Sequence, residues 1–208
     1  AVTPAALAVK VANATKIYGQ ANPSFTLQYT GLQNGDVAAS LSGVPLFLAS
    51  ADASTGVGSY AVTVGGLTSA DYAITFQAGP LNITPAALTI AVNDVTRAYG
   101  QANPSFTLSY TGLVNGDLSS VVTGTPVFST VATPASPAGD YAVTVSGLSA
   151  ANYTITYLPG DLTVLAGLTI IGTVLVDNTG NGLSDDDTTP IAGVTVKLYA
   201  DSDHNGVR

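Results

Sequence analysis

The sequence contains no cysteine, methionine, tryptophan or glutamate, and only 9% of its 208 residues are charged. Without cysteine the chain forms no disulfide bonds, so its stability must come from packing, from metal or from another kind of covalent cross-link. All 13 acidic residues are aspartates, which favour turns and calcium loops, whereas glutamate favours helices. We therefore expect helices to be few and short.

Positive charge is also scarce, since lysine and arginine together number 5 and the formal net charge is −8. Nucleic-acid binding needs a basic surface, so this class of function is excluded. No apolar run reaches the length of about 18 residues that a membrane-spanning helix needs, so we predict no such segment. Residues 1–10 lack the charged start and long apolar core of a signal peptide, so export has to be inferred from other features.

Apolar residues make up 46% of the chain, and the 22 glycines and 11 prolines are typical of short strands joined by tight turns. In several segments the apolar residues alternate with threonine, alanine or other small residues, which is the pattern of a strand with one buried face. The apolar sets are Leu7, Val9 and Val11; Phe25, Leu27 and Tyr29; Tyr60, Val62 and Val64; and Tyr72, Ile74 and Phe76. The sequence thus predicts an all-β fold.

The chain contains an internal repeat. Thr3–Leu7 returns as Thr84–Leu88, and Tyr18–Leu27 returns as Tyr99–Leu108, both shifted by 81 positions. The same shift aligns Asn34-Gly35-Asp36 with residues 115–117 without a gap. A constant shift over this length indicates a duplicated domain.

Glycine-rich segments punctuate each copy. We interpret Asn34-Gly35-Asp36 and Gly65-Gly66 as turns, and Gly56-Val57-Gly58 as part of a hairpin, because a strand and not a helix follows it. Val37–Leu41 and Leu118–Val122 are each predicted to form one short helix, with the aspartate before it near the cap.

The block Tyr-Gly-Gln-Ala-Asn-Pro-Ser-Phe-Thr-Leu-x-Tyr-Thr-Gly-Leu, which starts at Tyr18 and again at Tyr99, resembles the signature of the MBG repeat of the YGX type. The Asn-Gly-Asp turn and the Gly-x-Tyr-Ala-Val-Thr-Val run, present in both copies, support the resemblance, which covers about residues 3–164. Such repeats occur in tandem in large bacterial surface and secreted proteins. The resemblance implies an extracellular location, at the cell surface or secreted, and a spacer or adhesive role without catalytic residues.

We divide the chain into two MBG-like repeats, residues 1–83 and 84–166, and a third segment, residues 167–208. Thr84-Pro85 is the whole connection between the first two, and such a short connection with a fixed φ limits bending. The expected architecture is a set of tandem small β-sandwiches, Ig-like or β-grasp-like, arranged in a rod with at most one short helix per repeat.

The third segment is rich in aspartate, and we predict that it binds Ca²⁺. Its first loop places oxygen ligands and a sharp glycine turn at the spacing that a calcium ion requires; the predicted ligands are the side chains of Asp177, Thr179, Asn181 and Asp185 and the carbonyl of Leu183. Thr188 stands where a calcium loop of the EF-hand type has a bidentate glutamate, and Asp186 or Asp187 can take its place. A second loop supplies Asp201, Asp203 and Asn205.

Residues 168–208 resemble the first half of the B repeat of the serine-aspartate-repeat surface adhesins, in which such loops bind calcium within a small Ig-like domain. The alternative interpretation is that aspartate and asparagine gather here only because turns favour them. The single histidine, His204, lies inside the second loop without a nucleophile motif, so we expect no enzyme activity. An internal Lys–Asn isopeptide bond is impossible in the second copy, which has no lysine, and only Lys10 or Lys16 could form one in the first.

Three functional hypotheses remain open at this point. The leading one is a passive stalk or fibre segment whose partners are neighbouring repeats. The second is a self-assembling filament in which a neighbouring copy completes the third segment, and the third is an accessory carbohydrate-binding module. The tyrosines fall mostly in the buried phase of predicted strands, which disfavours the third hypothesis. A surface glycan or a protein ligand remains open as an additional partner.

Overall fold

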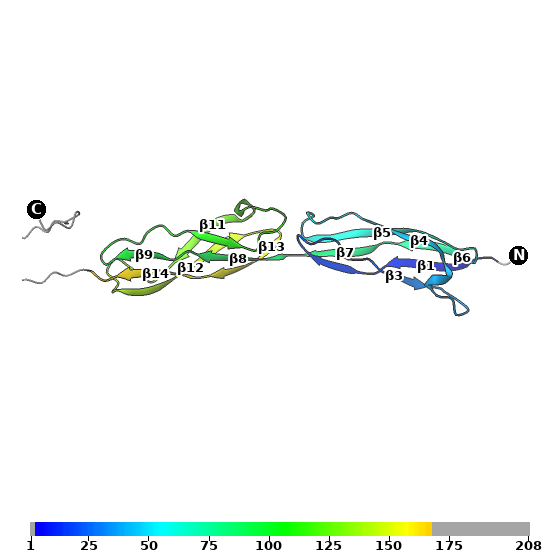
Figure 1. The fold of residues 1–208 in the computed structure, drawn as a ribbon, viewed down its shortest axis with the longest axis horizontal. Coiled ribbons are helices and arrows are strands. Elements are labelled where there is room, and N and C mark those ends of the chain that lie inside the picture. The colour runs from blue at the N-terminus through cyan, green and yellow to red at the C-terminus, as the bar shows by residue number, and fades with distance from the viewer. Residues whose placement is uncertain (1–2, 168–208) are drawn as a thin grey trace, which may run out of the picture. The chain divides into compact units, whose positions relative to one another are not determined.

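The computed structural model describes residues 3–167. The chain divides into two compact units, Ala1–Ala166 and Gly167–Arg208, and the first unit contains both MBG-like copies (Figure 1). Its elements are strands and two short 3₁₀ helices, so the predicted all-β fold is confirmed for this part of the chain. No helix within it is long and apolar enough to cross a membrane.

Repeat 1, the first copy, is a sandwich of a three-stranded and a four-stranded sheet. In the three-stranded sheet β1 lies in the centre, antiparallel to β3 and parallel to β6. In the four-stranded sheet β2 is parallel to β7, and β5 is antiparallel to both β7 and β4. The strands are β1 (Ala5–Val11), β2 (Ala14–Ile17), β3 (Leu27–Thr30), β4 (Ser42–Ala49), β5 (Gly58–Thr68), β6 (Tyr72–Gln77) and β7 (Gly79–Thr84).

Repeat 2, the second copy, has the same topology, which confirms the duplication predicted from the 81-residue shift. Every strand begins 81 positions after its counterpart, and only β11 ends one residue early. The strands are β8 (Ala86–Val92), β9 (Val95–Ala98), β10 (Leu108–Thr111), β11 (Thr123–Ser129), β12 (Gly139–Ser149), β13 (Tyr153–Leu158) and β14 (Gly160–Leu165).

The core lies between the two sheets of each repeat, where the alternating apolar residues point. Leu7, Val9 and Val11 of β1 are buried, as predicted, and so are Val62 and Val64 of β5. The other predicted faces are less enclosed, because Phe25, Leu27 and Tyr29 are half-buried and Phe76 is exposed. Phe25 also precedes β3 and packs on Phe47, with 5.7 Å between the ring centroids.

The interpretation of Gly65-Gly66 as a turn is wrong, because both glycines lie inside β5. The pairing of β5 with β4 shifts register here, and the backbones approach so closely that a Cβ on Gly66 would lie 2.4 Å from the carbonyl oxygen of Val44. The extra residue of this β-bulge lies in β4, between Gly43 and Leu46, and Gly66 is the residue of β5 opposite it. The predicted hairpin around Gly56 is confirmed as the connection between the antiparallel strands β4 and β5.

The two predicted short helices are single 3₁₀ turns, η1 (Ala38–Ser40) and η2 (Ser119–Val121). The aspartates before them do not act as caps, since neither helix has a side-chain cap hydrogen bond. The carboxylates of Asp36 and Asp117 instead accept hydrogen bonds from tyrosines in β6 and β13.

Candidate functional site

The predicted calcium ligands lie outside the residues that the structure describes. They are Asp177, Thr179, Asn181, Leu183, Asp185, Asp187, Asp201, Asp203 and Asn205, together with the alternative ligand Asp186. Between residues 3 and 167, no group of three or more histidine and acidic side chains is placed to hold a metal ion. The calcium site remains a prediction.

Lys16, one of the two candidates for an isopeptide bond, is buried with its ammonium group facing backbone carbonyls. Its Nζ donates to the carbonyl oxygens of Gln20 and Asp52, and 5% of the residue is exposed. Its counterpart Arg97 is buried to the same extent, and its Nε donates to Asn103 Oδ1 at 2.8 Å. The cation thus fastens the loop that precedes β5 or β12 to the loop after β2 or β9.

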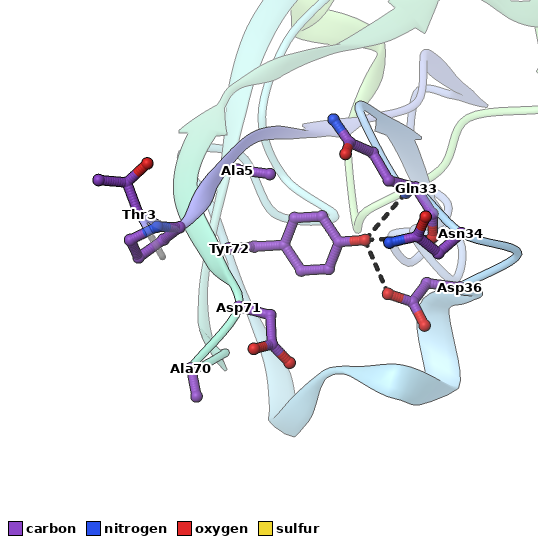
Figure 2. A pocket seen from close by; sticks show the side chains of 9 residues that line it. Thr3, Ala5, Gln33, Asn34, Asp36, Ala70, Asp71 and Tyr72 are labelled. Atoms are coloured by element: carbon purple, nitrogen blue, oxygen red, sulfur yellow. Dashed lines mark hydrogen bonds between the residues drawn. The ribbon is translucent and has the colours of Figure 1, made fainter. Parts of the chain in front are cut away.

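The Asn-Gly-Asp turn, which follows β3 in repeat 1 and β10 in repeat 2, forms a small polar site. Asn34 has φ 55° and Gly35 has φ 85°, a left-handed pair that folds the chain back so that Asp36 faces β6. The Tyr72 hydroxyl donates to Asp36 Oδ2 at 2.7 Å and accepts from the backbone N–H of Gln33 at 2.9 Å. Figure 2 shows the Tyr72 ring reaching across to this turn, with its hydroxyl directed at Asp36.

This site opens into a pocket of about 410 Å³. The pocket walls come from the start of β1, from the turn and from the start of β6, and they include Thr3, Pro4, Ala5, Asn34, Asp71 and Tyr72 (Figure 2). Its polar side chains are acids, amides and hydroxyls, which can exchange hydrogen bonds with a backbone but offer no nucleophile and base pair for catalysis.

Repeat 2 builds the same turn at residues 114–117. The Tyr153 hydroxyl donates to Asp117 Oδ2 at 2.6 Å and accepts from the Val114 N–H at 3.1 Å. Burial, and then the Asp117 hydrogen bond, raise the pKa of Tyr153 above its ordinary value. For Tyr72 the Gln33 hydrogen bond acts to lower the pKa, but the Asp36 hydrogen bond and burial outweigh it, and the net pKa is raised.

In repeat 2 this surface is in contact with repeat 1. The Tyr18 hydroxyl donates to Asp117 Oδ2 at 3.1 Å, so this oxygen accepts from tyrosines of both repeats. The rings of Tyr18 and Tyr153 meet edge to face, with centroids 5.5 Å apart. Both tyrosines belong to a hydrophobic cluster that includes Val11 of repeat 1 and Leu88 of repeat 2.

The loop between β4 and β5 adds two polar contacts to this junction. Asn115 Nδ2 donates to the carbonyl oxygen of Ala53 at 3.0 Å, and the backbone N–H of Val57 donates to Asn152 Oδ1 at 3.0 Å. The loop is held in shape by Asp52, whose carboxylate accepts from Ser54 and Thr55. These hydrogen bonds lower the pKa of Asp52, so the turn keeps its charge below the ordinary pKa of aspartate.

Gly19 lets the two repeats approach closely. Its φ is +87°, and a Cβ there would lie 2.5 Å from Val114 Cγ2. We call the surface formed by Tyr18, Gly19 and residues 53–57 the donor end of a repeat. We call the surface that it contacts the acceptor end; in repeat 2 it is formed by Val114, Asn115, Asp117, Asn152 and Tyr153.

Sequence reasoning used the Tyr-Gly and Asn-Gly-Asp segments as marks of a family and interpreted Asn-Gly-Asp as a turn, but it gave neither segment a role in contacts between repeats. A signal was present, because the 81-residue shift keeps both segments in both copies, whereas a local turn tolerates many residues. The shift does not say which segment of one copy meets which segment of the next, so the junction could not be derived from it.

Comparisons with known proteins identify a family and a likeness to solved structures. A family model for the MBG domain (YGX type) matches residues 7–82 and again 88–163. Among solved structures, the chain is similar to the fibronectin(III)-like modules of Clostridium thermocellum CbhA, with 13% identity, a TM-score of 0.25, and coverage of 76% of this chain and 94% of that one. A TM-score this low does not establish a shared fold. None of the curated proteins matches the sequence.

Proposed function

Since the chain belongs to the family of MBG domains of the YGX type, we propose that it is a non-catalytic extracellular module, a stiff stalk or fibre segment of a large bacterial surface protein. In this role it holds something away from the cell or joins two parts of an extracellular structure. Its partners are neighbouring repeats, with a surface glycan or a protein ligand as further candidates.

The observation that carries this proposal is the junction between the two repeats. Only Pro85 separates β7 from β8, and its ring fixes φ. The Tyr18 hydroxyl, the Ala53 carbonyl and the Val57 N–H each bond to repeat 2, so the joint is held by side contacts as well as by the short connection. A joint of this kind resists bending, which is what a spacer requires.

Calcium is the second part of the proposal. The aspartates of the third segment repel one another without a counter-ion, so bound Ca²⁺ would stabilise it by linkage, by about 2.7 kcal/mol when free calcium is a hundred times the dissociation constant. The same ion would stiffen the third segment itself. Residues 3–167 hold no comparable acidic cluster and should not respond.

The test is differential melting and limited proteolysis of the full chain in calcium and in chelator, together with the Asp177→Ala variant. We expect calcium to protect residues 168–208 from protease and the variant to weaken this protection. Equal protection in chelator would contradict the metal assignment. Small-angle scattering of the same samples tests the stalk, because a spacer should keep one elongated envelope at all concentrations.

A self-assembling filament is the second candidate, favoured by the edge strand β4. Val44, Leu46 and Leu48 of this strand expose most of their side chains, and an apolar sheet edge is a template for pairing with another chain. Concentration-dependent growth of the particle in sedimentation would favour this candidate over the stalk. A carbohydrate-binding module has less support, because Tyr18, Tyr72 and Tyr153 are buried.

A further inference from the structure

Repeat 1 carries an acceptor end of its own, at the pocket beside Thr3 and Pro4. Asn34 occupies the place of Asn115, Asp36 that of Asp117, and Tyr72 that of Tyr153. The internal geometry is also the same, since Tyr72 bonds Asp36 Oδ2 at 2.7 Å and Tyr153 bonds Asp117 Oδ2 at 2.6 Å. In repeat 2 this surface receives the donor end of another repeat.

We propose that the pocket of repeat 1 is a docking face for the donor end of another YGX-type repeat joined through Thr3-Pro4. The inference deepens the proposed role of neighbouring repeats as partners. It stands apart from the calcium and localisation parts of that proposal, because docking can fail while those parts hold.

Each contact of the observed junction has a matching group in the pocket. Asp36 Oδ2 accepts from Tyr72 and, as a carboxylate oxygen, can accept a second hydroxyl as Asp117 Oδ2 does. Asn34 presents the amide that in Asn115 donates to a backbone carbonyl. Asp71 replaces Asn152, and its carboxylate can accept the backbone N–H that Asn152 Oδ1 accepts from Val57.

The connecting sequence supports the same occupant. Thr3-Pro4-Ala5 repeats Thr84-Pro85-Ala86, where Thr84 ends β7 of one repeat and Ala86 begins β8 of the next. Thr3, Pro4 and Ala5 all line the pocket. A repeat joined through Thr3-Pro4 would therefore enter with the same one-residue linker that places the observed donor end on repeat 2.

One residue distinguishes the two acceptor ends. Val114, which lies against Gly19, is replaced in repeat 1 by Gln33, a longer and more flexible side chain. In the observed donor end the residue after the tyrosine has φ +87°, a left-handed conformation that favours glycine, so an occupant with the same turn needs a glycine after its tyrosine. The Tyr-Gly pair of a YGX-type repeat meets this requirement.

The experiment extends the full chain with a second copy of residues 3–83 inserted directly before Thr3. The protein has no cysteine, so an engineered pair holds the only thiols. The test pair is Ala53→Cys in the added copy with Asn34→Cys in repeat 1, and the reference pair is Ala53→Cys with Asn115→Cys in the unextended chain. Disulfide exchange with glutathione gives the effective concentration of one thiol near the other.

We expect the test pair to reach an effective concentration within about tenfold of the reference pair. Tyr18→Phe in the added copy should lower it by roughly five- to tenfold, because the hydroxyl loses its bond to Asp36. The same substitution in the unextended chain is the matched control and should lower the reference value equally. A test value a hundredfold below the reference, or one that Tyr18→Phe leaves unchanged, would overturn the proposal.

A second copy of the chain is the competing occupant, docking through the donor end of repeat 2. Pro134 corresponds to Ala53 in that end. The unextended chain with Asn34→Cys and Pro134→Cys should therefore stay monomeric under mild oxidation. Rapid formation of disulfide-linked multimers would assign the pocket to a second copy and overturn the tandem occupant proposed here.

Discussion

The two repeats share every element, yet equivalent residues have different surroundings. Tyr18 is 6% exposed and bonds to repeat 2, whereas Tyr99, at the same position of the fold, is 51% exposed. The difference arises from place in the tandem, since the sequence around both tyrosines is the same from residue 18 to 27 and from 99 to 108. In a repeat array the role of a residue is therefore set partly by its neighbour.

A second difference lies inside the repeats. Arg97 Nε bonds Asn103 Oδ1 at 2.8 Å, and Asn103 Nδ2 bonds the Ala132 carbonyl at 2.8 Å. In repeat 1 the single ammonium group of Lys16 donates to the carbonyl oxygens of Gln20 and Asp52 and makes no bond to Asn22. Within the described residues the buried Oδ1 of Asn22 has no hydrogen-bond partner. One arginine thus satisfies a polar group that the equivalent lysine leaves unsatisfied.

The largest contrast between the repeats is expected at the glycine after each tyrosine. Gly19→Ala should destabilise the chain by about 3–4 kcal/mol, as the sum of left-handed strain and overlap with Val114. Gly100 has a similar φ, +81°, but within residues 3–167 nothing lies within 4 Å of its would-be Cβ, so Gly100→Ala should cost only about 1–2 kcal/mol. Urea unfolding measures both variants.

A second substitution separates the left-handed strain at residue 19 from the overlap with Val114. Val114→Ala added to Gly19→Ala should recover part of the loss by making room at the junction. If the two glycine variants are equally unstable, the close approach of the repeats is not real.

Exchanging the buried cations should move the two repeats in opposite directions. Arg97→Lys leaves Asn103 Oδ1 without its donor and should cost about 1–3 kcal/mol. Lys16→Arg offers Asn22 Oδ1 a donor and should stabilise repeat 1 by about 1 kcal/mol. Thermal unfolding of both variants is the measurement, and a loss of stability in Lys16→Arg would contradict this account.

Removing a tyrosine hydroxyl should lower stability at Tyr18, which lies in the junction, and not at its counterpart Tyr99. Tyr18→Phe loses the bond to Asp117 but keeps the ring contact with Tyr153, and should cost about 1 kcal/mol. Tyr99→Phe is the matched control and should be close to neutral. Hydrogen exchange over residues 84–92 should rise in the first variant alone.

Alkaline pH should loosen both acceptor ends. The pKa values of Tyr72 and Tyr153 are raised in the folded chain, so the folded state holds these protons more tightly than the unfolded state. Stability from the two hydroxyls is complete below the ordinary tyrosine pKa of about 10 and is lost as the pH rises through the raised values. Between pH 8 and 12 the midpoint of unfolding should fall less steeply with rising pH in Tyr153→Phe than in the unchanged protein. An equal slope in the two proteins would contradict this assignment.

The sequence predicted the buried strands and missed the exposed or polar ones. β1, β5 and their counterparts have regular alternation, because one face is fully buried. In β4 the side chains of Val44, Leu46 and Leu48 point to solvent and Pro45 lies within the strand, so the sequence does not have the pattern of a half-buried strand. β2 is only four residues long, and its buried residue is Lys16.

The candidate site was less predictable than the fold. Tyr18 and Asp117 are 99 positions apart and meet only because two separately folded domains touch, which hydrophobic periodicity does not encode. Gly65-Gly66, which lies opposite a bulge in β4, was mistaken for a turn because glycine pairs occur both in turns and at bulges. Side-chain pairing across domains depends on surfaces that exist only after each domain has folded.

The parallel pairing of β2 with β7 has a mechanical consequence. The chain enters β2 at Ala14 and leaves β7 at Thr84, at opposite ends of a ladder that pairs Ala14 with Leu81 and Ile17 with Thr84. Tension on the polypeptide therefore slides the two strands past each other and loads their hydrogen bonds together, instead of opening them one after another. β9 and β14 repeat this arrangement. A pulling force would therefore have to break the hydrogen bonds of a parallel strand pair together, in shear, before either repeat could extend.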